Sequence, residues 1–176
     1  MVEAVMELPA LELSDGAIAT SCALGWLAWS LLIGYGAQRL DPHWLAGFAA
    51  LDGPLPWVDD PQWCQRVLGI RRWKDQLPEA GAFFPGGRSK RSLSGGDGPG
   101  TVAKQRTQLE RFVAETRRAE LVHLALLPFA LVTALWCPPW AVAVNLAFAA
   151  LFNLPCLLVQ RFNRRRLLRL LGRLKA

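Results

Sequence analysis

Three long apolar runs dominate the pattern of hydrophobic and polar positions along this chain. The first covers residues 18–37 and carries no charged side chain, which is about the length a helix needs to cross a hydrocarbon core of ~30 Å. The second covers residues 121–136 and contains His123 and Pro128, and the third covers residues 139–159. The pattern predicts an all-α integral membrane protein with three transmembrane helices.

A secretory signal peptide is the alternative interpretation of the first run. Signal peptides begin with a basic segment, whereas the residues before this run include Glu3, Glu7, Glu12 and Asp15. We therefore expect the first span to stay in the mature chain. The content of 52 % hydrophobic residues agrees with spans of this kind, and we expect one membrane domain over residues 1–176.

The region 38–120, between the first two spans, is predicted to form interfacial amphipathic segments on the cytoplasmic face. It mixes tryptophan, phenylalanine and leucine with turn formers, a composition that favours the headgroup layer. Asp60 followed by Pro61 is typical of a helix start, and that helix should end near Gly69. The glycine-rich stretch 85–100 matches no phosphate-binding spacing and is expected to be a flexible connector.

The second and third spans are predicted to form an antiparallel hairpin. Thr107 and Glu110 have the spacing of a capping box, which predicts a helix that starts near Gln108 and continues into the second span. Pro128 is expected to kink this helix. Prolines within residues 137–139 then end it and turn the chain into the third span.

Charge orients the predicted spans. All 20 Lys and Arg residues follow the first span, so the positive-inside rule places the N-terminus outside and the C-terminus in the cytoplasm of a bacterial inner or internal membrane. Residues 161–175 combine leucines and arginines at helical spacing and predict a basic C-terminal helix suited to an anionic leaflet. The net charge of +6 thus indicates contact with membrane lipids and not nucleic-acid binding.

Cofactor and metal chemistry is not indicated. The four cysteines lack a Cys-X-X-Cys spacing, so we expect neither disulfides nor a zinc site. The motifs of serine hydrolases, zinc hydrolases and nucleotide-binding loops do not occur in the sequence. We therefore expect no bound cofactor.

The stretch from Glu115 to His123 places several charges at the mouth of the second span, where charge is costly and usually functional. Glu120 precedes His123 by three residues, close enough on a helix to orient the imidazole. A histidine fixed by a carboxylate is suited to taking a proton from a hydroxyl. Alternatively, His123 caps a polar cluster, while Glu115, Glu120, Arg117 and Arg118 form an ion-pair network.

A polar stripe follows one face of the third span and its extension. At about 100° per residue its members share an arc of roughly 100°: Asn145, Asn153, Gln160, Asn163 and Arg164. Such amides in lipid must face protein, water or a ligand. At ~1.5 Å per residue, Asn153 lies about 12 Å outward from Arg161. His123 lies about 7 Å outward from Arg118 by the same count. We therefore expect His123, Asn153 and Gln160 to line one cytoplasmic pocket, although hydrogen bonds that only join the helices are the alternative.

A cationic, aromatic patch precedes the glycine-rich stretch. Arg71, Arg72 and Lys74 flank Trp73, and such side chains can hold a phosphate or pyrophosphate. A lipid phosphate at the membrane surface would satisfy the same residues, so the sequence leaves both ligands open.

Three segments together resemble a known family. They are WKDQLPEAG, ETRRAELVH and the pattern N…NLPCLLVQRFNRRRL that starts at Asn145. They are similar to segments of the small membrane acyltransferases typified by glycosyl-4,4'-diaponeurosporenoate acyltransferase, and the resemblance covers about residues 63–174. The first 60 residues match only in having a span, and the arginine run lacks a proline that the family often has.

The resemblance implies transfer of a fatty acyl group to a sugar hydroxyl of a carotenoid glycoside or other glycolipid. The implied donor is a thioester, on acyl-CoA or acyl carrier protein. His123 with Glu120 would be the base, and Asn153 and Gln160 would polarise the thioester or hold the sugar. The implied holders of the donor phosphates are Arg117, Arg118, Arg161 and Arg164. The competing hypothesis is a non-catalytic subunit or assembly factor of a larger membrane complex, which binds lipid, pigment or a partner helix.

Overall fold

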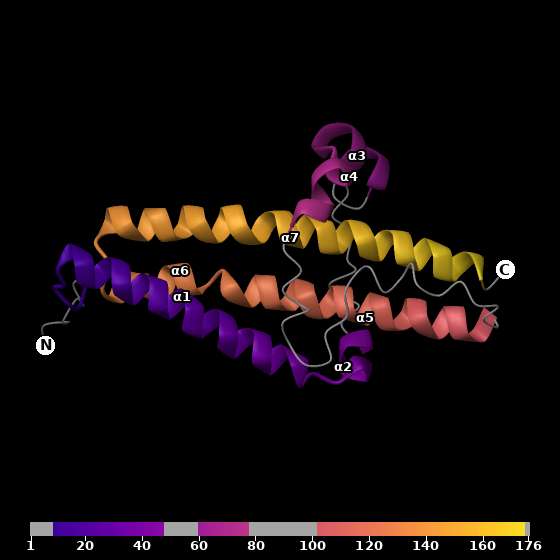
Figure 1. The fold of residues 1–176 in the computed structure, drawn as a ribbon, viewed down its shortest axis with the longest axis horizontal. Helices are drawn as coiled ribbons and strands as arrows, with labels where there is room; N and C mark the ends of the chain where they lie inside the picture. The colour runs from indigo at the N-terminus through magenta and orange to yellow at the C-terminus, as the bar shows by residue number, and fades with distance from the viewer. Residues whose placement is uncertain (1–8, 48–59, 78–101, 175–176) are drawn as a thin grey trace, which may run out of the picture.

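The computed structural model describes residues 9–47, 60–77 and 102–174, and the regular elements in these ranges are helices (Figure 1). Three of them are long: α1 (Asp15–Gln38), α5 (Val102–Leu126) and α7 (Pro139–Arg173). The short elements are α2 (Pro42–Gly47), α3 (Pro61–Leu68), α4 (Ile70–Trp73), α6 (Phe129–Val132) and the 3-10 turns η2 (Lys74–Gln76) and η5 (Thr133–Leu135).

Three helical stretches are long and apolar enough to cross a membrane. They are Asp15–Gln38, Lys104–Leu135 and Pro139–Arg173, and the second of them joins α5, α6 and η5. The predicted all-α fold with three spans is confirmed, although each helix extends beyond its apolar run.

The first span begins at a hydrogen-bonded cap. Ser14 has an extended backbone, and its Oγ accepts a hydrogen bond from the N–H of Ala17, one of the N–H groups of the first turn that lack a partner within the helix. Many large apolar side chains of α1 are exposed, as suits a helix surrounded by lipid: Leu24, Leu27, Leu31, Leu32 and Tyr35. Only a narrow strip of α1 therefore packs on the other helices.

Tryptophan side chains fasten α1 to the hairpin. Trp26 Nε1 donates to Asn145 Oδ1 on α7 over 2.8 Å, and Trp29 Nε1 donates to the carbonyl of Ala125 on α5 over 3.0 Å. The ring of Trp26 also packs edge-on against Phe129, with 4.9 Å between the ring centroids. These contacts bind α1 to both arms of the hairpin.

Gly25 permits the close approach of α1 to α6, because a Cβ atom there would lie 2.6 Å from Cζ of Phe129. Since Phe129 is buried between Trp26 and Trp29, it cannot swing away. We expect Gly25→Ala to destabilise the fold by about 1–3 kcal/mol, measured by unfolding in detergent micelles. Gly36→Ala is the matched control, because nothing lies within 4 Å of a Cβ there; equal losses for both variants would contradict the expectation.

The α5 and α7 helices run side by side in opposite directions, as the predicted hairpin requires (Figure 1). Pro128 interrupts the first arm, since α5 ends at Leu126 and α6 starts at Phe129. Proline has no N–H to continue the helical hydrogen bonds and clashes with the preceding turn. The predicted kink is therefore a complete break in the helix.

The predicted start of the first arm near Gln108 is wrong, because α5 already begins at Val102. Thr107 lies inside the helix, and Glu110 pairs with Arg106 over 2.9 Å. The residues between 102 and 107 are mostly good helix formers, so the helix extends past the position where a capping box could have started it.

The basic C-terminal segment is helical, but it is not a separate helix. α7 runs from Pro139 to Arg173 as one helix of 35 residues, with Pro155 inside it. At ~1.5 Å per residue this is about 52 Å, well beyond a hydrocarbon core of ~30 Å. The arginines after residue 160 thus continue the axis of the third span.

The two short helices α3 and α4 pack on α7 (Figure 1). Asp60 caps α3 by accepting the N–H of Gln62 over 2.8 Å, and Gly69 ends it with a left-handed φ of 55°, so the predicted start and end are confirmed. Their buried face joins Val159 and Phe162 of α7 in one cluster. The connector predicted at 85–100 lies outside the described residues.

Candidate functional site

The hairpin brings His123 of α5 against Asn153 of α7. Nδ1 of the imidazole lies 2.9 Å from Oδ1 of the amide, and Asn153 is only 4 % exposed. The two residues were predicted to lie at similar depth on facing helices, and this contact confirms it. The histidine and the polar stripe therefore meet inside the hairpin.

The amide of Asn153 has a defined orientation, and this determines which imidazole nitrogen of His123 carries the hydrogen. Asn153 Nδ2 donates to the carbonyl of Ala149, one turn earlier, over 2.8 Å, so Oδ1 must be the atom that faces the imidazole. An amide oxygen only accepts hydrogen bonds, and the imidazole nitrogen next to it must therefore carry the hydrogen. The other nitrogen, Nε2, is left with its lone pair and can act as a base.

His123 Nε2 makes no hydrogen bond to any side chain or carbonyl in the described part of the chain. The imidazole is half-buried, at the level where the apolar part of α5 begins. Its basic nitrogen is therefore available to a hydroxyl group of a bound molecule, while the amide holds the ring.

Glu120 does not orient His123, contrary to the prediction. Its carboxylate is 2 % exposed and lies between two guanidinium groups of α7: Oε1 accepts from Arg161 Nε over 2.7 Å, and Oε2 is 2.5 Å from Arg164 Nη1. A buried carboxylate is stabilised far more by a neighbouring cation than by a neutral imidazole. The antiparallel pairing of α5 and α7 places both arginines opposite Glu120. The imidazole of His123 is oriented by Asn153 instead.

The two arginines before Glu120 hold the chain that follows α1. Arg118 pairs with Glu115 over 2.5 Å and donates to the carbonyl of Leu40 over 3.2 Å. Arg117 donates to the carbonyl of Leu45, in α2, over 3.2 Å. Both side chains are buried. Of the ion-pair network expected as the alternative, Arg118 pairs with Glu115, whereas Glu120 pairs with Arg161 and Arg164 of α7.

The rest of the predicted stripe divides into two groups. Asn145 is engaged by Trp26 and by the carbonyl of Ala141, and it lies about 12 Å along α7 from Asn153 by the rise per residue. It therefore joins α1 to α7 and is not part of the histidine site. Gln160 and Asn163 are half-buried on the arginine side of Asn153, and neither side chain hydrogen-bonds within the described residues.

The cationic patch lies on the short helices. Arg72 is exposed, and Lys74 pairs with Asp75 over 2.7 Å. Trp73 packs into the cluster on α7 and donates to the carbonyl of Leu68 over 2.8 Å. No hydrogen bond or ion pair within the described residues joins this patch to His123.

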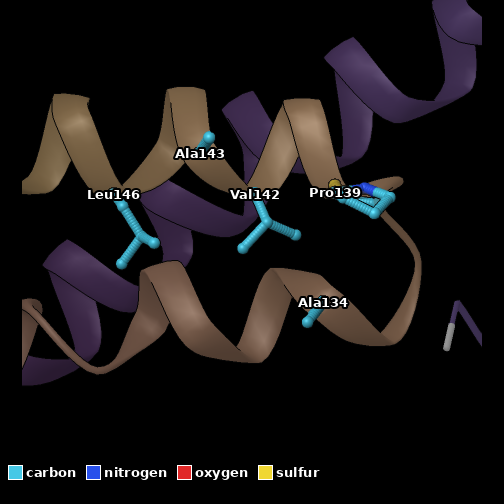
Figure 2. A pocket seen from close by; sticks show the side chains of 6 residues that line it. Ala134, Pro139, Val142, Ala143 and Leu146 are labelled. Atoms are coloured by element: carbon cyan, nitrogen blue, oxygen red, sulfur yellow. The ribbon is translucent and has the colours of Figure 1, made fainter.

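An apolar cavity of about 330 Å³ lies at the turn of the hairpin (Figure 2). The residues that line it come from η5, the turn and the start of α7: Ala134, Cys137, Pro139, Val142, Ala143 and Leu146. None of the predicted site residues contributes to it. The cavity lies at the opposite end of α7 from the arginines, and it has no polar group suited to chemistry.

The four cysteines are free thiols. Cys22 and Cys137 lie close together, with 3.3 Å between their sulfur atoms. In the described ranges, no group of three or more His, Cys, Asp or Glu side chains is placed to hold a metal ion.

Sequence reasoning missed the choice of partners. Tryptophans that hydrogen-bond across helices, as Trp26 does to Asn145, have no spacing signal. The pairing of Glu120 with Arg161 depends on the register of the hairpin, that is, on which residues of α5 and α7 lie opposite each other. The turn between the two arms determines this register.

Fold and site define a membrane protein of three long helices, in which a helical hairpin holds a histidine with one basic nitrogen beside an asparagine. The family model described as glycosyl-4,4'-diaponeurosporenoate acyltransferase matches residues 43–173. This chain belongs to that family.

Relatives of the same name occur in staphylococci. The protein of Staphylococcus aureus strain USA300 is 38% identical over 155 residues, which is 88% of either chain. That of the bovine strain RF122 is 30% identical over the same share of each chain. The protein of Staphylococcus haemolyticus is 31% identical over 103 residues, or 58% of this chain and 54% of the relative. No solved structure matches significantly.

Proposed function

We propose that this protein transfers a fatty acyl group from a thioester to a sugar hydroxyl of a carotenoid glycoside or a related glycolipid. The observation that carries the proposal is the His123–Asn153 pair, which leaves one imidazole nitrogen as a base. Relatives named as glycosyl-4,4'-diaponeurosporenoate acyltransferases support the acceptor class. The concentration of Lys and Arg after the first span supports a cytoplasmic site in a bacterial inner membrane.

The chemistry follows from the two nitrogens of the ring. The sugar hydroxyl gives its proton to His123 Nε2 as its oxygen attacks the thioester carbonyl, and the C–S bond then breaks. The thiolate takes the proton from the imidazolium, so the products are an ester and a free thiol. Asn153 Oδ1 accepts the Nδ1 hydrogen throughout and stabilises the positive charge of the ring.

The acceptor sugar binds on the arginine side of His123 in this proposal. Gln160 lies about 10 Å along α7 from Asn153 by the rise per residue, and its half-buried amide offers both a donor and an acceptor to sugar hydroxyls. Asn163 follows one turn later. The apolar part of the acceptor then extends into the bilayer beside the spans.

In this proposal the phosphates of the acyl donor bind to cationic side chains that do not form buried ion pairs. Arg161 and Arg164 are already engaged by Glu120, whereas Arg72 is exposed next to Lys74. Phosphate groups of acyl-CoA, or of the arm of an acyl carrier protein, can bind at such exposed cations.

Replacing Asn153 tests the assignment. We expect Asn153→Leu to lower the rate roughly 10²-fold, because the imidazole loses the acceptor that fixes its hydrogen. Asn153→Asp keeps an acceptor oxygen and should retain most of the rate. The measurement is ester formation by purified protein in lipid vesicles with a carotenoid glucoside and an acyl thioester, followed by mass spectrometry.

Two outcomes would contradict the proposal. If Asn153→Leu transferred acyl groups at the wild-type rate, the His123–Asn153 pair would have no part in the mechanism. Folded wild-type protein that forms no ester would favour the non-catalytic subunit.

A further inference from the structure

The α5–α7 hairpin is longer than a membrane is thick. Residues 139–160 of α7 carry no charge and span about 33 Å at the rise of a helix, which fills a hydrocarbon core of ~30 Å. Residues 161–173 then extend about 20 Å farther along the same axis. α5 lies beside this extension (Figure 1). We call the α7 extension together with the facing part of α5 the basic stalk.

The six arginines of the α7 extension comprise an inward pair, the half-buried Arg165 and an exposed set of three. Arg161 and Arg164 turn inward and pair with Glu120. Three others are exposed, and they form the arginine stripe: Arg166, Arg169 and Arg173. Their spacing of three and four residues places them within an arc of about 60° on the helix.

Ion pairing distinguishes the arginine stripe from Arg161 and Arg164. Within the described residues no carboxylate pairs with any of the three side chains. Arg166 lies over an aromatic ring, with its guanidinium 5.9 Å from the ring centroid of Phe162. Among the described residues, the stripe thus presents positive charge that no carboxylate pairs with.

The stalk geometry argues against a leaflet as the partner. A helix that lies on a membrane buries its apolar face in lipid. In this segment Leu167 is buried within the protein, whereas Leu170 is 44 % exposed. Counted from residue 160, Arg169 lies about 13 Å and Arg173 about 20 Å beyond the hydrocarbon. The headgroup layer adds only about 5–7 Å on each side. Most of the stripe therefore stands clear of the headgroups, where an acidic protein surface can dock by charge complementarity.

We propose that the arginine stripe docks an acidic carrier protein that delivers the acyl thioester to His123. This inference rests on the proposed function and names its donor. Arg166 lies about 20 Å along α7 from Asn153, so a carrier docked at the stripe must present the acyl group on an extended arm, as carrier-bound thioesters do. Acyl-CoA is small enough to reach the site without the stripe.

A comparison of donors tests the inference. The variant Arg166→Glu/Arg169→Glu/Arg173→Glu is assayed in vesicles of zwitterionic lipid, with acyl carrier protein or acyl-CoA bearing the same acyl chain. We expect kcat/KM with the carrier to fall tenfold or more, as reversed charge at a complementary interface does. With acyl-CoA it should change less than about twofold. Arg66→Glu, at an exposed position of α3, is the matched control and should leave both rates unchanged.

The outcomes separate this inference from the proposed function. Equal losses with both donors, or no loss with either, overturn the stripe as a carrier site. A variant that keeps its carrier rate but no longer responds to anionic lipid added to the vesicles shows that lipid is the partner, and also overturns it. Binding of fluorescent carrier protein to vesicles with wild-type or variant protein needs no turnover. This binding measurement tests the stripe even if neither donor supports acyl transfer. Absence of transfer with both donors would contradict the proposed function but not the carrier site.

Discussion

His123→Ala is expected to lower the rate of acyl transfer by about 10²- to 10⁴-fold, the usual contribution of a general base. Its imidazole is the only side chain that hydrogen-bonds to Asn153 Oδ1 in the described residues, and it offers a lone pair to a substrate hydroxyl. The side chain is only half-buried between the two helices, so the helices should remain folded. The measurement is the initial rate of ester formation in vesicles, with circular dichroism to confirm helix content.

The chain contains a matched control for this substitution. His43 is the second of the two histidines, and it is exposed on α2. His43→Ala should leave the rate within about twofold of wild type, since a surface substitution away from the site changes little. A rate retained in His123→Ala, or lost equally in both variants, is incompatible with His123 as the base.

Glu120→Gln is expected to destabilise the protein by about 3–5 kcal/mol, the cost of removing one partner from a buried ion pair. The substitution keeps the size of the side chain but leaves Arg161 and Arg164 without their carboxylate in a site that is nearly inaccessible to water. The stability is measured by unfolding the purified protein in mixed micelles with increasing denaturing detergent.

An exposed pair on the same helix supplies the comparison. Glu110 pairs with Arg106 over 2.9 Å, and about half of each side chain is exposed. Glu110→Gln should cost less than about 1 kcal/mol, because surface ion pairs contribute little. Losses of equal size for Glu110→Gln and Glu120→Gln would show that the buried cluster does not hold the hairpin together.

Most of the architecture could be predicted from the sequence, because apolar length and proline position determine it. The charge-free run of α1 and the prolines at 138 and 139 predicted three spans and a hairpin. The hairpin in turn predicted that His123 and Asn153 lie at matching depth, and they are in contact. Depth follows from counting residues along a helix of known rise, so it does not depend on how the helices are rotated.

The pairing of side chains could not be predicted, because it depends on the rotation and register of packed helices. Glu120 is three residues from His123, and this spacing suggested a contact. The facing helix offered two cations to the carboxylate instead, and a buried charge selects an opposite charge over a neutral ring. Asn145 shares a face of α7 with Asn153, but α1 covers it with Trp26, and the sequence contains no signal for that contact.

The central claim is that the hairpin fixes His123 with Nδ1 protonated and Nε2 free to act as a base. Nitrogen-15 NMR of the imidazole tests it most directly, in vesicles and at a pH where the ring is neutral. His43→Gln leaves a single histidine to observe. We expect an Nδ1 signal of a protonated nitrogen and an Nε2 signal of an unprotonated one, with the preference lost in Asn153→Leu. A spectrum in which Nε2 carries the hydrogen in the presence of Asn153 would contradict it.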